Sequence, residues 1–91
     1  MEDIKVSHKN LGKERAWGTA NLDNNKIELD HRLKGKKHLE ILTHEALHLL
    51  DKDMSEEEVE RVSITLTNLL WKCGYRRVDD SNTIPLQDGK K

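Results

Sequence analysis

The chain has 91 residues, with 16 Lys and Arg against 17 Asp and Glu, one Cys and no Phe. This length accommodates one small domain and excludes two. Apolar residues make up 34% and charged residues 36% of the sequence, so the hydrophobic core is small and the surface densely charged. Because the single cysteine, Cys73, forms no internal disulfide, a bound metal or a partner chain is the expected reinforcement of so small a core.

Charge and hydropathy narrow the classes of function. The net charge of -1 argues against a protein that mainly coats nucleic acid, so nucleic acid is not a favoured partner. No apolar stretch approaches the roughly 20 residues of a membrane span, so no membrane association is expected. The acidic start, Met1-Glu2-Asp3, is unlike a secretory signal, and an unpaired cysteine suits a reducing compartment. We therefore expect a cytoplasmic protein.

A β-hairpin is predicted in the first third of the chain. Residues 16–22 and 26–30 flank Asp23-Asn24-Asn25, and Asp and Asn tolerate the turn conformations that a hairpin needs. In the second arm Ile27 and Leu29 share one face, while charged residues occupy the other. This alternation is typical of a strand that is buried on one side.

An amphipathic helix is predicted from Lys36 to Asp51. Its apolar positions recur at helical spacing and form one stripe, made up of Leu39, Leu42, Ala46, Leu49 and Leu50. Ile41 and Leu47 lie on opposite flanks of this stripe. The pattern indicates a helix buried on more than one side, between a sheet and another helix.

A second helix is predicted to begin after Ser55. Ser55 is a suitable N-cap, and Glu58 three residues later completes a capping box. The apolar stripe of this helix consists of Val59, Val62, Leu66, Leu69 and Leu70. Gly74 follows as the C-terminal stop. The sequence thus predicts an α+β domain over residues 1–75, with a small antiparallel sheet packed on the first helix, and a loosely attached polar tail over 76–91.

The segment His44-Glu45-Ala46-Leu47-His48 matches the pattern H-E-x-x-H in the middle of the first helix. Spacing of four residues places both imidazoles one turn apart on one face, where both can reach a tetrahedral Zn²⁺, and Glu45 lies beside them to accept a proton from bound water. The alternative is a chance pattern whose histidines make ordinary hydrogen bonds. The uncharged residues around the motif favour the metal, because a metal-binding helix is neutral and buried on that side.

A catalytic zinc site needs a third protein ligand. The acidic candidates downstream are Asp51, Asp53, Glu56, Glu57, Glu58 and Glu60. On a helical wheel Glu57 and Glu60 point away, whereas Glu56 shares a face with Val59. Glu58 already has a capping role. We therefore favour Glu56 as the third ligand, with Glu58 as the alternative, and an aspartate or a residue of another chain behind them.

Over residues 17–71 the sequence resembles the small phage and bacterial zincins related to the ImmA/IrrE-type metallopeptidases. The resemblance rests on Trp17-Gly18-Thr19, Lys26-Ile27-Glu28-Leu29-Asp30, His44-Glu45-Ala46-Leu47-His48 and the helix start Ser55-Glu56-Glu57-Glu58-Val59-Glu60-Arg61-Val62-Ser63. It implies a minimal zincin-like fold with an active-site helix followed by a second helix. It also implies zinc held by His44, His48 and an acidic residue of the second helix, with Glu45 as general base. Glu56 fits the family's Glu-x-x-Val pattern, and Glu58 fits the Glu that precedes an apolar residue in longer relatives.

The leading hypothesis is a zinc-dependent metallopeptidase that hydrolyses a peptide or protein with a zinc-activated water, Glu45 being the general base. The alternative is a non-catalytic scaffold, stabilised by zinc, that binds a protein or nucleic-acid partner. A third hypothesis is a metal-free, phage-type interaction protein. Bound metal distinguishes the third hypothesis from the first two.

The strand at 26–30 is expected to be the sheet edge nearest the metal, where an extended peptide adds as a further strand. The alternative is that residues 4–6, which alternate apolar and polar side chains, cover this edge. Residues 7–15 are polar and are predicted to form a loop.

The remaining titratable residues are assigned minor roles. His8, His31 and His38 lie in polar surroundings and are predicted to be exposed. The basic cluster of Arg32, Lys34, Lys36 and Lys37 is predicted to be a solvated turn, the alternative being contact with an acidic partner or nucleic acid. Cys73 is predicted to pack.

Overall fold

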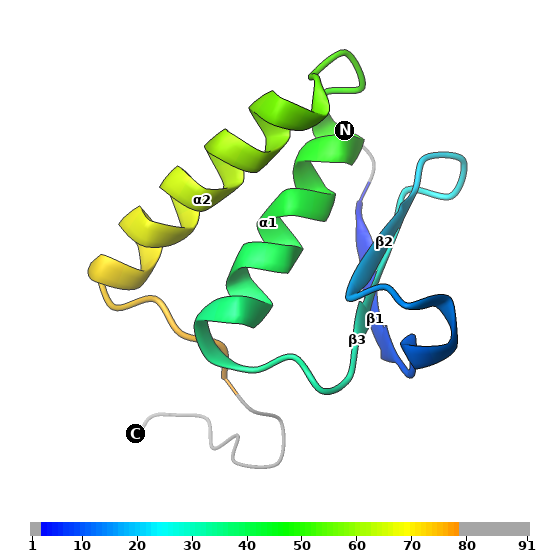
Figure 1. Ribbon diagram of the computed structural model, residues 1–91, viewed down its shortest axis with the longest axis horizontal. Helices are drawn as coiled ribbons and strands as arrows, with labels where there is room; N and C mark the ends of the chain where they lie inside the picture. The colour runs from blue at the N-terminus through cyan, green and yellow to red at the C-terminus, as the bar shows by residue number, and fades with distance from the viewer. Residues whose placement is uncertain (1–2, 79–91) are drawn as a thin grey trace.

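Three short strands form a mixed sheet along one side of the molecule (Figure 1). The computed structural model describes residues 3–78, and 79–91, most of the predicted tail, lie outside the described part. The strands are β1 (Lys5–Lys9), β2 (Gly18–Asn21) and β3 (Lys26–Asp30), in the order β1-β3-β2. β2 and β3 pair antiparallel as the predicted hairpin, and β1 pairs parallel to β3.

The position of β3 corrects the expectation about the sheet edge. β3 is the central strand, because its second side pairs with β1 from Lys5↔Lys26 to Lys9↔Asp30. The alternative, in which the N-terminal segment covers this side, is therefore correct. β1 also extends to Lys9, into residues predicted to be a loop, and a short 3-10 helix, η1 (Gly12–Glu14), follows it.

Two antiparallel helices complete the α+β domain, and α1 lies between α2 and the sheet (Figure 1). α1 runs from Gly35 to Leu50 and α2 from Glu56 to Lys72, each within one residue of its prediction. The capping box at Ser55 is confirmed, and Gly74 has a φ of +95°, as a helix stop requires. None of the helices in residues 3–78 combines the length and apolar character needed to cross a membrane.

The core lies between the sheet and α1. Ile27, Leu29 and Leu33 are buried, and the side chains of Ile4, Ile41, Leu42, Ala46 and Leu49 pack against them. Ile41 therefore faces the core although the predicted stripe excludes it, and Leu50, which the stripe includes, is 53% exposed. Leu50 is the last residue of α1, and about half of the surface of this residue is exposed to solvent.

The buried residues of α2 are small. Val59, Ser63 and Thr67 are buried, and the Thr67 hydroxyl lies 3.0 Å from that of Thr43 on α1. Leu69, which belongs to the predicted apolar stripe, is 56% exposed. Of the predicted stripe, Val59 is buried and Val62, Leu66 and Leu70 are half-buried, so the prediction is wrong at Leu69 and omits the buried Ser63 and Thr67.

Candidate metal centre

His44 and His48 lie one turn apart on α1, as their spacing predicts. Their ring centroids are 4.9 Å apart, and 18% of the His44 side chain and 32% of the His48 side chain are exposed. Both rings therefore stand at the edge of the helix interface, partly shielded and still accessible to a ligand from solvent.

Glu56, the first residue of α2, brings a carboxylate to both rings. Its Oε1 lies 3.1 Å from Nε2 of His48, and its Oε2 lies 3.7 Å from Nε2 of His44. Glu56 precedes Val59 and Ser63 on the buried face of α2, so the same register that packs the helices directs Glu56 towards α1. Of the two ligands considered for the third position, the structure brings Glu56 to the histidines.

The donor set of this cluster fits zinc. One ligand atom from each of His44, His48 and Glu56 lies within 4.8 Å of the other two. Within residues 3–78, these three residues are the group of His, Cys, Asp or Glu side chains that lie close enough together to hold a metal ion. Zn–N and Zn–O distances near 2 Å place tetrahedral ligands about 3.3 Å apart, so small side-chain rotations close the site. Two imidazoles and one carboxylate also leave a fourth position for water or substrate, as catalytic zinc sites do.

Glu45 lies between the two histidines in the sequence and is partly buried. Burial raises the pKa of its carboxyl above the ordinary value, while His44 and His48 act in the opposite direction. Strand β2 approaches Glu45 closely: a Cβ added to Gly18 would lie 2.7 Å from Cγ2 of Ile41 and 3.2 Å from Cγ of Glu45. Glycine at position 18 therefore allows the strand to lie against this part of α1.

Glu60 corrects the wheel analysis, which placed it away from the site. Its Oε1 lies 3.6 Å from Nδ1 of His44, the ring nitrogen opposite the one that faces Glu56. A metal-binding imidazole usually donates its second N–H to a carboxylate, which fixes the tautomer and the ring orientation. Glu60 is suited to that positioning role. Glu60 follows Glu56 by four residues, which is about one helical turn, so the two side chains lie on the same face of α2. This spacing identifies Glu60 in the sequence.

The other acidic candidates have different surroundings. The Glu58 carboxylate accepts the backbone N–H of Ser55 at 3.0 Å, so Glu58 closes the capping box. Asp51 accepts the backbone N–H of Asp53 at 3.1 Å in the turn between the helices. Glu57 is exposed. None of these residues belongs to the group with His44 and His48 within the described chain.

Histidines outside the motif form a second contact. His38 is only 6% exposed, so its predicted exposure is wrong, whereas His8 and His31 are exposed. The rings of His8 and His38 stack with their Nε2 atoms 3.0 Å apart. Burial lowers the pKa of His38, and nearby Arg77 and His8 act in the same direction. Cys73, predicted to pack, is exposed.

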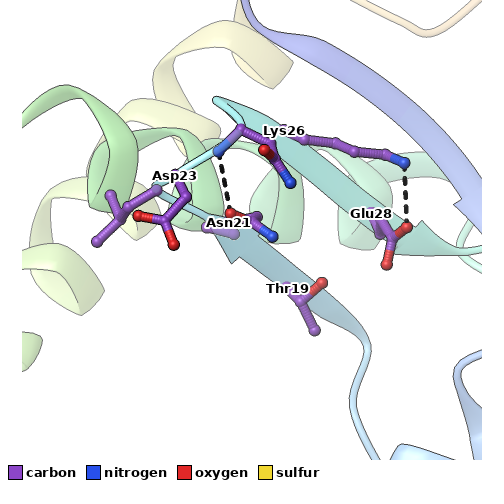
Figure 2. A pocket seen from close by; sticks show the side chains of 8 residues that line it. Thr19, Asn21, Asp23, Lys26 and Glu28 are labelled. Carbon is purple, nitrogen blue, oxygen red and sulfur yellow. Dashed lines mark hydrogen bonds and ion pairs between the residues drawn. The ribbon is translucent and has the colours of Figure 1, made fainter.

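A hollow of about 620 Å³ lies on the face of the hairpin that points away from α1 (Figure 2). Lys26 Nζ lies 3.4 Å from Glu28 Oε2, and Asn21 accepts the backbone N–H of Asn24 at 3.1 Å. Thr19 and Asp23 also line this hollow (Figure 2). Because neither His44, His48 nor Glu56 lines the hollow, it is separate from the metal cluster.

Comparisons with protein-family models, with curated proteins and with solved structures find no match for this chain.

Proposed function

We propose that this protein is a zinc-dependent metallopeptidase with a minimal zincin-like fold, acting on a peptide or protein in the cytoplasm. The observation that carries the proposal is the convergence of three groups: the paired imidazoles of His44 and His48, the carboxylate of Glu56 from a second helix, and Glu45 beside them. The resemblance of the same residues to zincin motifs supports it.

Each residue has a separate role in this proposal. His44, His48 and Glu56 hold the ion, and Glu60 orients the ring of His44 through Nδ1. Zinc, when bound, acidifies a coordinated water and polarises the carbonyl to be attacked. Glu45 contributes no ligand atom to the group; it accepts the proton of the water and returns it to the leaving amine.

The proposed peptide-binding edge is β2. In the described part of the chain β2 pairs with β3 alone, and Gly18 brings it against Glu45. An extended peptide adding to this edge has its backbone held beside the general base. On binding of an extended, zinc-directed peptide inhibitor, we expect slower hydrogen exchange of the outward-facing amides of Gly18–Asn21. The opposite edge, β1, is the internal control, and protection of β1 in place of β2 would contradict this assignment.

The decisive test of catalysis is Glu45→Gln. This variant is expected to bind as much zinc per chain as the wild type and to lose hydrolysis by about 100-fold or more, the scale of general base catalysis. Cleavage is measured by mass spectrometry on a broad peptide library, and zinc by elemental analysis. Glu40→Gln, on the same helix, is the matched control and retains activity. Wild-type protein that holds zinc and cleaves no peptide would favour the scaffold hypothesis.

A further inference from the structure

The two ends of the helical hairpin carry opposite charge. Residues 51–60 contain the acidic side chains Asp51, Asp53, Glu56, Glu57, Glu58 and Glu60, with Lys52 as the single cation. Neither 31–39 nor 66–78 contains a carboxylate, and these segments carry Arg32, Lys34, Lys36, Lys37, Lys72, Arg76 and Arg77, whereas Arg61 lies beside the glutamates of the acidic end. Because α1 and α2 are antiparallel, the start of α1 and the end of α2 lie at the same end of the hairpin (Figure 1). We call this the basic end and define it by Lys34, Lys36, Lys37, Arg76 and Arg77.

Two adjoining hollows open at the basic end. One measures about 210 Å³ and is mainly apolar, with Leu39, Leu42, Trp71 and Tyr75 in its lining. The other measures about 400 Å³ and is lined by His31, Leu33, Lys34, Gly35 and Arg77. Gly35 and Arg77 line both, so an apolar recess lies directly beside a cationic one.

An aromatic platform borders the apolar recess. The guanidinium carbon of Arg76 lies 3.5 Å from the centroid of the Trp71 ring, and its Nη1 donates to the carbonyls of Trp71 and Tyr75 at 3.0 Å each. These contacts hold a guanidinium over the indole. Tyr75 is 64% exposed, so its ring is available to a ligand. Aromatic rings and guanidinium planes are the groups on which unpaired nucleic-acid bases stack.

We propose that the basic end binds single-stranded nucleic acid. A base stacks on Tyr75 at the apolar recess, and the adjoining phosphate lies in the cationic recess between Lys34 and Arg77. The charge segregation explains how a chain of net charge -1 presents a local cationic surface, while the acidic end of the hairpin stays away from the strand. A duplex is disfavoured because its bases are stacked on one another and do not reach Tyr75. This proposal does not depend on the metal centre.

The test uses the full chain and a fluorescently labelled ten-nucleotide oligothymidylate, with binding followed by anisotropy across a salt series. Tyr75→Ala is expected to weaken binding about 5- to 150-fold, the range for loss of one stacked base, while Tyr75→Phe binds as the wild type does. Arg77→Ala and Lys34→Ala each weaken binding and reduce the slope of log affinity against log salt by about 0.7. Lys52→Ala, which removes a lysine at the acidic end, is the matched control. His48→Ala leaves the affinity unchanged, which separates this surface from the metal centre.

Four results would overturn the proposal. The first is the absence of salt-dependent binding by the wild type. The second is an equal loss of affinity in Lys52→Ala and Arg77→Ala. The third is competition by thymidine monophosphate at the same concentration as the oligonucleotide, which would indicate a mononucleotide site. The fourth is equally tight binding of an oligoglutamate peptide with no effect of Tyr75→Ala, which would indicate an acidic protein partner.

Discussion

Replacing His48 with Ala is expected to reduce the affinity of the protein for Zn²⁺ by about 150-fold or more. Structural zinc sites bind with apparent free energies of roughly 10–16 kcal/mol, and division over three protein ligands assigns about 3 kcal/mol or more to each. His48 Nε2 is also the nitrogen closest to the Glu56 carboxylate, at 3.1 Å, so its loss removes one side of the cluster. Competition with a zinc-responsive dye at fixed pH measures the affinity.

A series of glutamine substitutions on α2 distinguishes ligand, positioning residue and cap. Glu56→Gln is expected to match the loss in His48→Ala, because Glu56 offers the third ligand atom of the proposed site. Glu60→Gln is expected to weaken zinc binding by about 10- to 100-fold, the usual effect of losing the carboxylate that orients a metal-bound histidine. Glu58→Gln keeps the capping box, because a glutamine side-chain oxygen also accepts the Ser55 N–H, and leaves zinc affinity close to that of the wild type.

The order of these affinities tests the site as a whole. If Glu58→Gln weakens zinc binding more than Glu56→Gln does, α2 is rotated and the cluster is assigned incorrectly. If wild-type protein binds no zinc, the metal-free hypothesis is favoured. Thermal unfolding supplies an independent readout, since zinc at 100 times its dissociation constant stabilises the wild type by about 2.7 kcal/mol and the His48→Ala chain by much less.

The helices and the placement of two histidines on one helix face could be predicted because their signals are local. His44 and His48 are linked by helical periodicity alone, and the Ser55–Glu58 capping box is contained in four residues. Glu56 is the least local of these predictions, because its place beside the histidines depends on how α2 docks on α1. The wheel places it correctly since Val59 is buried at the same interface.

Two features that the sequence does not reveal depend on contacts between distant segments. β3 becomes central only when β1 pairs with it in parallel, across more than 20 residues, and no local pattern specifies that partner. His38 is buried through its stacking with His8 on β1, 30 residues away. Glu60 differs, because its signal is local: it follows Glu56 by one helical turn and so lies on the same side of α2, where its Oε1 comes to 3.6 Å from Nδ1 of His44.

Asp30→Ala is expected to lower the melting temperature by more than about 10 °C, the largest loss of stability that we predict. Asp30 is fully buried at the end of β3 and accepts hydrogen bonds from the backbone N–H of Leu11 at 3.0 Å and of Arg32 at 2.9 Å. The Arg32 side chain donates to it as well, at 2.8 Å from Nε and 3.1 Å from Nη2. Removing the carboxylate leaves these donors, including a guanidinium, without their acceptor.

Acid should reproduce part of this effect in the wild type. The Arg32 side chain, followed by the backbone N–H groups, holds the pKa of Asp30 far below its ordinary value of 3.8. A lowered pKa in the folded state means that the unfolded chain binds the proton more readily. The carboxylate therefore stabilises the fold above about pH 4, and this stabilisation is lost progressively as the pH falls below that value.

Melting curves of the wild type and of Asp30→Asn between pH 2.5 and 7 should therefore converge at the acid end. Asp23→Asn, in the exposed hairpin turn, is the matched control and should follow the wild type. Parallel curves for wild type and Asp30→Asn over the whole range would show that the ionised carboxylate of Asp30 does not hold β3 to the segment that precedes η1.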